Sequence, residues 1–396
     1  MPVSKDPRKI DELLTRGVAE IYPTKEALEK LLLSGKRIRL YMGVDPTSPH
    51  LHIGHALQLR KMRQFQDLGH EVILLIGSFT GMIGDPTDKT AARQKLTRAQ
   101  VMANARTYKK QAAKILSFTG ANAVKLKYNH TWLAKLNFED VTELASHFTA
   151  QQIEDRDMFE RRMKEGKPVY LHEFLYPLMQ GYDSVAMDVD MEIGGTDQTF
   201  NMLAGRTLMK AMKNKEKFVM TLKLLTNDEG KKMSKSEGGF IALSDTPEDM
   251  FGKIMAMDDS VIIPYFELAT DVSLKEVEEK RRALAGGANP RDSKMELART
   301  VVTMYHGARA AEKATAQFVK TFQKKEQPDE IPAVKARGTI VDVLVASKFA
   351  SSKTDARRLI AQGGVKVNDV VVTDVAMTVK HGSVIQKGKR YFVRVV

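Results

Sequence analysis

Two histidines three residues apart mark the first segment that could do chemistry. The segment YMGVDPTSPHLHIGHALQLRKM (41–62) predicts a strand, a polar turn and a helix that begins near His52. His52 and His55 would share one face of that helix, where they could donate hydrogen bonds to phosphate oxygens. Gly43 would let a substrate approach the backbone, and Gly54 would let a flat adenine stack on the first helical turn without meeting a Cβ. The arrangement favours a phosphate group undergoing displacement.

A second segment of this kind is a lysine-rich loop further along the chain. LLTNDEGKKMSKSEGG (224–239) follows an apolar run, and Lys232 and Lys235 bracket Met233 and Ser234. Adenylyl transfer builds negative charge on the departing pyrophosphate, and two flexible ammonium groups could close on it in the transition state. On its own such a loop could equally be a solvated surface segment. HIGH followed by KMSKS is far more specific, so we expect both histidines and both lysines to be catalytic.

A third pattern lies on a predicted helix. Tyr176, Gln180 and Asp183, in YPLMQGYD, fall at positions i, i+4 and i+7, which share one helical face. An ordinary amphipathic helix would show the same spacing. If Asp183 and Tyr41 face a buried cavity, however, their polar groups stay unpaired unless a substrate hydroxyl fills the space.

The composition limits which chemistry is available. The chain has no Cys, which excludes disulfides, thiolate zinc sites and Cys nucleophiles. His50, His52 and His55 could together bind a transition metal. No nearby carboxylate completes such a ligand set and Pro49 stiffens the approach, so we expect no metal site.

Strand-like and helix-like segments alternate along the first part of the chain. Short apolar runs (38–44, 72–76, 124–126 and 218–225) alternate with long amphipathic segments (56–68 and 98–116). This alternation predicts an α/β fold with a doubly wound, Rossmann-like parallel sheet. Ligands of such sheets sit beyond the C-terminal ends of the strands, and that is where the polar motifs lie.

The pattern changes near residue 246. Residues 1–245 predict the catalytic α/β domain, and residues 246–325 a helical domain. Residues 326–338 are charged, contain two prolines and lack periodicity, so they predict a linker. A small α+β domain is expected at 339–396.

The net charge of +13 is distributed unevenly. Residues 331–396 carry 12 Lys and Arg against 4 Asp, a local charge of +8. On charge alone this could be a polyanion site or a solvated basic face. No apolar run approaches the roughly 20 residues that span a bilayer, and the N-terminus lacks a secretory signal, so we expect a cytoplasmic protein without a membrane segment.

HIGH and KMSKS together form the signature of the first class of aminoacyl-tRNA synthetases, and the chain resembles the tyrosyl-tRNA synthetase family over essentially its full length. The resemblance implies ATP with Mg²⁺ as a substrate and no tightly bound cofactor. It also implies L-tyrosine, tyrosine tRNA and a second copy of the chain as partners, with the helical domain on the anticodon side.

The resemblance also assigns the tyrosine site. Tyr41 and Asp183 match the pair that reaches the phenolic hydroxyl, and Gln180 and Asp85 match groups at the α-ammonium. The other expected tyrosine-binding residues, from the YPLMQGYD helix and the GGTDQ loop, are Tyr176 and Gln198.

The expected ATP site draws on four segments. The D-P-T turn matches residues near the adenylate and the phosphates. The GGTDQ segment matches a loop over the ribose and the amino acid, and Lys89 and Arg93 match a basic pair that grips pyrophosphate. Many members of the family carry Cys where Met42 stands, a difference that affects the ribose contacts modestly. The complete expected set is Gly43, Asp45, Thr47, Gly54, Lys89, Arg93, Gly195, Asp197, Met233 and Ser234.

The last domain resembles a small RNA-binding module named after a ribosomal small-subunit protein. Lys348, Lys353, Arg357 and Arg358 are expected on a short helix pair, and Lys366 in the turn GGVKVND, where such modules meet an RNA backbone. A generic basic α+β module is the alternative.

Three rivals remain at this point. Tryptophanyl-tRNA synthetase shares both signatures but has no use for the pair Tyr41 and Asp183 and usually lacks the basic tail. Small-molecule adenylyltransferases carry an H-x-G-H turn without needing residues 331–396. An inactive RNA-binding descendant should show decayed signatures, and these are intact.

Overall fold

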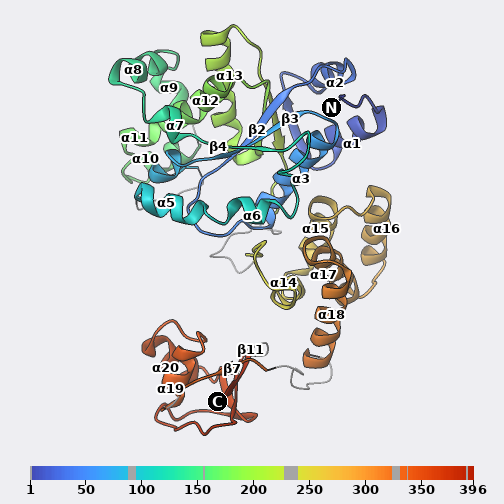
Figure 1. The fold of residues 1–396 in the computed structure, drawn as a ribbon, viewed down its shortest axis with the longest axis vertical. Helices are drawn as coiled ribbons and strands as arrows, with labels where there is room; N and C mark the ends of the chain where they lie inside the picture. Colours follow the sequence, from blue (N-terminus) through green and yellow to red (C-terminus); the bar gives the residue numbers. More distant parts are fainter. Residues whose placement is uncertain are drawn as a thin grey trace. The chain divides into compact units, whose positions relative to one another are not determined.

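Six strands build the central sheet of the first part of the chain, in the order β1-β6-β5-β2-β3-β4, and Figure 1 labels β2, β3 and β4 among them. This computed structural model describes residues 2–87, 95–154, 157–226, 240–322, 331–336, 338–388 and 391–396. Parallel pairing runs from β2 to β3 and β4 on one side, and to β5 and β6 on the other. The strands are β1 (Val18–Tyr22), β2 (Arg39–Val44), β3 (Glu71–Ile76), β4 (Lys125–Tyr128), β5 (Met191–Gly195) and β6 (Phe218–Leu222).

The predicted parallel sheet is confirmed, with two additions. β2, β3, β4 and β6 fall on the four predicted apolar runs. β5 is not predicted because Glu192 and two glycines interrupt its apolar pattern, although every residue of the strand is buried. β1 is not predicted either, and it runs antiparallel to β6 at the edge of the sheet.

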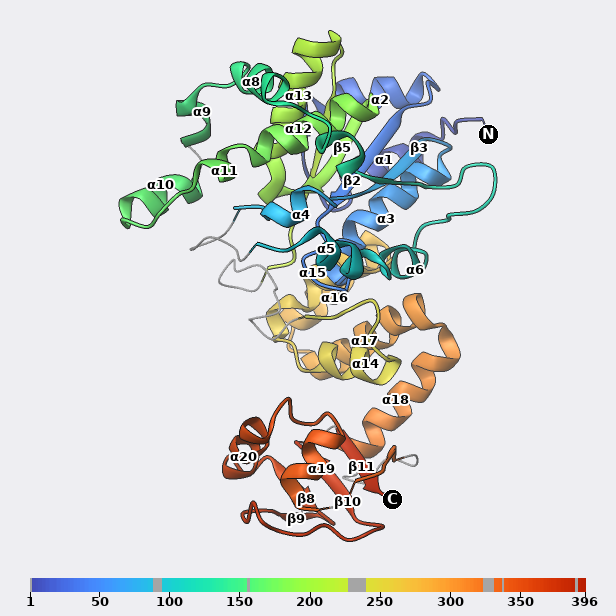
Figure 2. The same ribbon diagram turned by 60° about the vertical axis from the view of Figure 1, so that its left-hand side comes forward.

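Helices pack on both faces of the sheet. In both views α3 lies on one side, and α12 and α13 lie together on the other (Figures 1 and 2). The helices around this sheet are α1 (Pro7–Thr15), α2 (Lys25–Leu33), α3 (Ile53–Asp67), α4 (Thr80–Ile83), α5 (Arg98–Ala105), α6 (Tyr108–Ala112), α7 (His130–Leu133), α8 (Phe138–Ser146), α9 (Ala150–Glu154), α10 (Asp157–Lys164), α11 (Leu171–Phe174), α12 (Tyr176–Met187), the 3₁₀ turn η1 (Thr196–Gln198) and α13 (Thr199–Lys213).

The helix predicted over 98–116 is broken into α5 and α6. Side chains on both sides of the break donate to carbonyls of the turn that follows β2. Asn104 Nδ2 donates to Pro46 O at 2.9 Å, and Thr107 Oγ1 donates to Pro49 O at 2.9 Å. The break therefore ties α5 and α6 to the polar turn that carries Thr47, a contact that hydrophobic periodicity does not reveal.

Two glycines let α12 and α13 approach closely. A Cβ added at Gly181, on α12, would lie 3.1 Å from the backbone nitrogen of Gly205 on α13. Such a distance is tighter than ordinary van der Waals contact, so larger side chains would push the helices apart. α12 carries three of the expected tyrosine-binding residues, and this packing fixes its distance from α13.

The chain divides into two compact units. The first comprises Met1–Asp245 and Met257–Ser293, and the second comprises Thr246–Ala256 and Lys294–Val396. The 3₁₀ turn η3 (Asp259–Val261), α15 (Ile262–Ala269) and α16 (Leu274–Ala285) thus belong with the sheet. The units do not follow the predicted domain boundaries, which remain a proposal.

Arginine side chains hold α15 within the first unit. Arg16 Nη2 donates to Thr270 O at 2.8 Å, and Arg60, on α3, donates to Thr270 O at 2.6 Å. Guanidinium groups satisfy carbonyls left over at the C-terminal end of a helix and match its negative dipole. α15 therefore packs with α3, although the sequence groups it with the helices that follow.

The second unit contains the remaining helices and a small α+β module. α14 (Pro247–Met255) contacts α18 (Ala308–Phe322), where the Phe251 and Phe318 rings lie 5.3 Å apart. α17 (Pro290–His306) begins in the first unit and ends before Gly307, whose φ of 87° separates it from α18.

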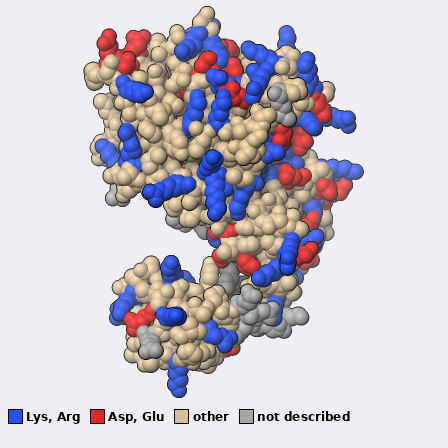
Figure 3. All heavy atoms as spheres, viewed as in Figure 1, with Lys and Arg blue, Asp and Glu red and all other residues tan. Residues whose placement is uncertain are grey.

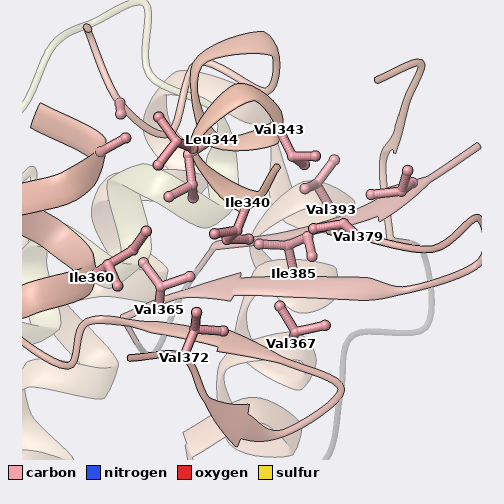
Figure 4. Close-up of a cluster of buried hydrophobic side chains, with 14 residues drawn as sticks. Ile340, Val343, Leu344, Ile360, Val365, Val367, Val372, Val379, Ile385 and Val393 are labelled. Atoms are coloured by element: carbon pink, nitrogen blue, oxygen red, sulfur yellow. The ribbon is translucent and has the colours of Figure 1, made fainter. Parts of the chain in front are cut away.

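The α+β module at the end of the chain has its own core. Its sheet has the order β7-β11-β10-β8-β9, and Ile340, Leu344, Ile360 and Ile385 meet between the sheet and the helices (Figure 4). Its elements are β7 (Ala333–Val334), α19 (Ile340–Ala346), α20 (Lys353–Ala361), β8 (Val365–Val367), β9 (Val370–Val371), β10 (Val384–Lys387) and β11 (Tyr391–Val395).

The predicted linker contains a strand. β7 lies within 326–338 and pairs in parallel with β11, where Val396 N donates to Val334 O at 3.0 Å. Ala333 and Val334 form backbone hydrogen bonds at the edge of the sheet. A short segment next to a proline does not predict such a strand. Within the described part of the chain, none of the helices combines the length and apolar character that crossing a lipid bilayer requires.

Candidate active site

The candidate site lies where the sheet changes its winding direction. From β2 the chain proceeds outward to β3 and β4, whereas β5 and β6 follow on the other side. Beyond the strand ends at this switch point is a cavity of about 570 Å³. Such crevices are where doubly wound sheets bind ligands. The expected site residues that line the cavity are Tyr41, Gly43, Asp45, Thr47, His52, His55, Asp85, Tyr176, Gln180, Asp183, Asp197 and Gln198.

The other expected residues fall into two groups. Gly54 and Gly195 line a smaller pocket of about 110 Å³ that also contacts His52 and His55. The remaining residues lie outside the described residues, and these are Lys89, Arg93, Lys232, Met233, Ser234 and Lys235.

Asp183 is a buried carboxylate held by two donors. Its side chain accepts from Trp132 Nε1 at 2.7 Å and from Asn129 Nδ2 at 3.2 Å. Burial raises the pKa of Asp183 well above its ordinary value, and these two hydrogen bonds act in the opposite direction. A carboxylate has about four acceptor positions, so Asp183 can still accept from a ligand hydroxyl.

Tyr41 stands beside Asp183 at the base of the cavity. Its side chain is fully buried, and its hydroxyl lies 3.0 Å from Ser184 Oγ. Burial, together with the nearby Glu192 and Asp183 charges, raises the pKa of Tyr41 well above its ordinary value. The phenol therefore remains protonated, and its hydroxyl also donates to the backbone oxygen of Gln180 at 3.5 Å.

Asp45 is fixed by groups from two other elements. Tyr176, on α12, donates its hydroxyl to Asp45 Oδ2 at 2.8 Å, and Thr80 Oγ1 donates to Oδ1 at 2.7 Å. Gly77, after β3, leaves the space that Asp45 occupies, because a Cβ there would overlap Oδ1. The turn after β2 is thereby joined to α12 and to the end of β3.

Asp85 and Gln198 contact each other across the cavity. Gln198 Nε2 donates to Asp85 Oδ2 at 2.5 Å, and Asn201 Nδ2 donates to Gln198 Oε1 at 3.1 Å. Asp85 Oδ1 also accepts from Thr87 N at 2.9 Å. The structure thus brings together two residues that are 113 positions apart in sequence.

His52 and His55 cap the N-terminus of α3. His52 precedes the helix, and its Nδ1 accepts from Gly54 N at 3.1 Å, while His55 Nδ1 accepts from His52 N at 3.2 Å. A neutral imidazole that accepts at Nδ1 carries its proton on Nε2. Each ring therefore has an Nε2–H donor, and the ring centroids are 3.9 Å apart. A helix N-terminus with two further donors suits phosphate oxygens.

His50 lines the same cavity as the other two histidines but has a different hydrogen-bond partner. Its Nδ1 lies 2.8 Å from Ser244 Oγ, in the segment before α14. Among the described residues, no three His, Cys, Asp or Glu side chains come together in a way that could hold a metal ion.

Sequence reasoning missed several polar residues of this site. Asn129 and Trp132, which hold Asp183, come directly after β4, where the general rule for strand ends could have pointed to them. Glu192 sits within the buried strand β5, and Lys217 directly precedes β6. A charged residue inside an apolar strand is a signal in itself, because a buried charge needs a partner.

Comparison with known proteins gives the family. The sequence profile described as "tRNA synthetases class I (W and Y)" matches residues 33–323. The chain belongs to this family. A second profile, the S4 domain, matches residues 339–385. The resemblance drawn from HIGH and KMSKS is confirmed.

Individual relatives match over nearly the whole chain. The tyrosine–tRNA ligase of Carboxydothermus hydrogenoformans is 44% identical over 412 residues, covering 100% of this chain and 99% of that protein. That of Thermotoga maritima is 45% identical, covering 98% of each. Among solved structures, a C-terminally truncated mitochondrial tyrosyl-tRNA synthetase from Coccidioides posadasii matches with a TM-score of 0.63 and 27% identity, covering 78% of this chain and 91% of that one.

The class I synthetase also carries basic residues on its S4 domain. Figure 3 shows Lys and Arg side chains on several sides of this domain. Lys353 pairs with Asp342 at 2.9 Å and Arg358 with Asp355 at 2.7 Å, while Arg357 is exposed on α20. Lys348 is not on a helix as expected, because α19 ends at Ala346 and Lys348 adopts a φ of 60° in the turn that follows.

Proposed function

We propose that the chain activates L-tyrosine with ATP, forming tyrosyl-adenylate and pyrophosphate, and then transfers tyrosine to the 3′ end of its tRNA. The observation that supports this most is the shared cavity of Tyr41, Asp183, His52 and His55. It combines groups for a phenol with groups for phosphate oxygens. Full-length similarity to tyrosine–tRNA ligases supports the same assignment.

The phenol of tyrosine would meet Tyr41 and Asp183. The substrate hydroxyl would donate to the Asp183 carboxylate and accept from Tyr41, in addition to the hydrogen bonds that both groups already make. Gln180 and Asp85 would contact the α-ammonium, with Tyr176 and Gln198 holding neighbouring side chains in place. A tryptophan side chain offers an N–H and no acceptor, so it could not accept a hydrogen bond from Tyr41 as the tyrosine hydroxyl would.

In the first reaction, a carboxylate oxygen of tyrosine attacks the α-phosphorus of ATP. The new O–P bond forms as the bond to pyrophosphate breaks. The Nε2–H groups of His52 and His55 would donate to phosphate oxygens as charge builds. Lys232 and Lys235 would neutralise the departing pyrophosphate, and Mg²⁺ would arrive with ATP, held mainly by phosphates and water.

In the second reaction, the terminal ribose hydroxyl of the tRNA attacks the carbonyl carbon of the adenylate and AMP leaves. We propose that Lys348, Lys353, Arg357, Arg358 and Lys366 contact the RNA backbone. The S4 profile over 339–385 and the excess of basic residues support this role. A cytoplasmic location stays a prediction.

We infer that two copies of the chain associate. Phe138 on α8 is 87% exposed and Leu171 on α11 is 77% exposed. α8, α10 and α11 lie on the same side of the first unit in both views (Figures 1 and 2). Large apolar side chains in one region of a surface are typical of an interface between proteins.

Pyrophosphate exchange with a panel of amino acids tests the function directly. Exchange of labelled pyrophosphate into ATP should require L-tyrosine and remain at background with L-tryptophan and L-phenylalanine. The structural reason is the paired demand of Tyr41 and Asp183 for a hydroxyl group. Exchange that depends on tryptophan, or on no amino acid, would contradict the proposal.

Removing the Asp183 carboxylate should weaken the choice of tyrosine. Asp183→Ala should lower the ratio of kcat/KM for L-tyrosine to that for L-phenylalanine by at least roughly ten-fold, because the phenol loses its acceptor. Asp67→Ala, on the exposed surface of α3, is the control and should leave the ratio unchanged. An unchanged ratio in Asp183→Ala would show that Asp183 does not recognise the phenol.

Basic residues of α20 should affect charging and not activation. Arg357→Ala combined with Arg358→Ala should raise the KM for tRNA roughly ten-fold, because two cations near the phosphate backbone are lost. Tyrosine-dependent pyrophosphate exchange should stay the same. Arg8→Ala with Lys9→Ala removes two adjacent exposed cations from α1 and serves as the control. Equal loss in both reactions would point to a folding defect instead.

A negative charge introduced into the exposed apolar surface of α8 and α11 should separate the two copies of the chain. In sedimentation equilibrium, the wild-type protein should have a mass of twice the chain mass of 44.3 kDa. Leu171→Asp should shift the measured mass toward that of one chain. The buried charge would cost several kcal/mol at an interface. Val370→Asp, at a residue 70% exposed on the S4 domain, is the matched control. A monomeric wild-type protein would rule out the dimer.

A further inference from the structure

We propose that Glu192 and Lys217 are a positioning pair, which turns the side-chain amide of Gln180 so that its carbonyl oxygen faces the α-ammonium of bound tyrosine. Neither residue is among those expected from the sequence. The inference rests on the proposed function. It adds a reason why the site for the α-ammonium presents a hydrogen-bond acceptor and not a donor.

Glu192 lies between the cavity and a buried cation. It lies on β5 directly opposite Tyr41 on β2, lines the cavity, and is 2% exposed. Its Oε1 accepts from Gln180 Nε2 at 3.0 Å, and its Oε2 accepts from Lys217 Nζ. One carboxylate thus contacts a cavity-lining amide with one oxygen and a buried cation with the other.

An ionised carboxylate determines the orientation of an amide beside it. Because it can only accept hydrogen bonds, it selects the NH₂ group of Gln180 and turns the carbonyl oxygen the other way. A carbonyl oxygen is the group that an ammonium needs as an acceptor. A protonated Glu192 could instead donate to that oxygen, and the amide would then present its NH₂ group, which repels an ammonium.

Lys217 is the counterion of Glu192. Burying a carboxylate is costly unless a counterion or hydrogen-bond donors compensate its charge. Lys217 is fully buried behind Glu192, and its ammonium also donates to Met202 O at 3.1 Å. Burial lowers the pKa of Lys217, and the neighbouring Glu192 acts in the opposite direction.

The surroundings leave room for this cation. The Lys217 ammonium lies 5.8 Å from the centroid of the Tyr41 ring, and both side chains are fully buried. A Cβ added at Gly205 would overlap it, so the glycine on α13 provides its space. Lys217 reaches the substrate only through Glu192, which makes it a positioning residue.

Two competitive inhibitors separate the ammonium from the phenol. Tyramine has both groups, whereas 4-ethylphenol lacks the amine, so the ratio of their Ki values against L-tyrosine measures ammonium recognition. In wild-type protein tyramine should bind more tightly. Glu192→Gln should lower this advantage at least roughly ten-fold, because the amide loses its fixed orientation, while the Ki of 4-ethylphenol changes little. The KM for ATP should stay the same.

A double variant distinguishes positioning from stability. Lys217→Met alone leaves a buried carboxylate without its cation and should lower the urea midpoint, followed through the fluorescence of Trp132, the only Trp in the chain. Glu192→Gln with Lys217→Met removes both charges and should recover the midpoint without recovering the inhibitor ratio. A structural pair would recover both, and that result would overturn the proposal.

A second buried ion pair supplies the matched control. Arg162 and Glu173 are 1% and 4% exposed and bond at 2.6 Å between α10 and α11. Arg162→Met with Glu173→Gln should leave the inhibitor ratio at the wild-type value. Equal weakening of both inhibitors in Glu192→Gln would also overturn the inference. Absence of tyrosine-dependent exchange in wild-type protein would instead refute the proposed function, so the two failures are distinguishable.

Discussion

Carboxylates gathered around one cavity set the main constraint on this structure. Asp45, Asp85, Asp183, Glu192 and Asp197 line the space beyond the strand ends. Bringing like charges together out of water is costly unless each receives hydrogen bonds or a counterion. The first four have such partners: hydroxyls for Asp45, an amide for Asp85, an indole and an amide for Asp183, and an ammonium for Glu192. These partners come from other elements, so compensating the charges also locks α7, α12, β5 and β6 together.

The acidic groups and the start of α3 divide the cavity by polarity. Carboxylates suit the ammonium and the hydroxyl of an amino acid, and they would repel a polyphosphate. The N-terminus of α3 offers the opposite environment, because its backbone N–H groups and two imidazoles present donors. An amino acid and a nucleotide could therefore occupy one cavity in a single orientation relative to each other.

The sequence predicted the general plan of the first unit and many residues of its cavity. Apolar runs identified four strands, and the rule for strand ends directed attention to the turns where His52, Asp45 and Asp85 lie. The sequence did not reveal β5, because Glu192 interrupts the apolar pattern of that strand. It also did not reveal that α5 and α6 are separate helices, because the break between them depends on carbonyls of a distant turn. The rule for strand ends could have marked Asn129 and Trp132 as site residues, but they are 54 and 51 residues away from Asp183, so their contact with it follows only from the order of the strands in the sheet.

The ion pair of Glu192 and Lys217 has a consequence for redesign of the pocket. Enlarging the cavity for a bulkier or differently charged amino acid invites substitution of the residues along β5, and Glu192 is one of them. Exchanging it alone would leave the Lys217 ammonium in the protein interior without its counterion, in the space that Gly205 provides. Libraries that vary positions 192 and 217 jointly, with 205 kept as glycine, should retain far more folded members than libraries that vary them one at a time.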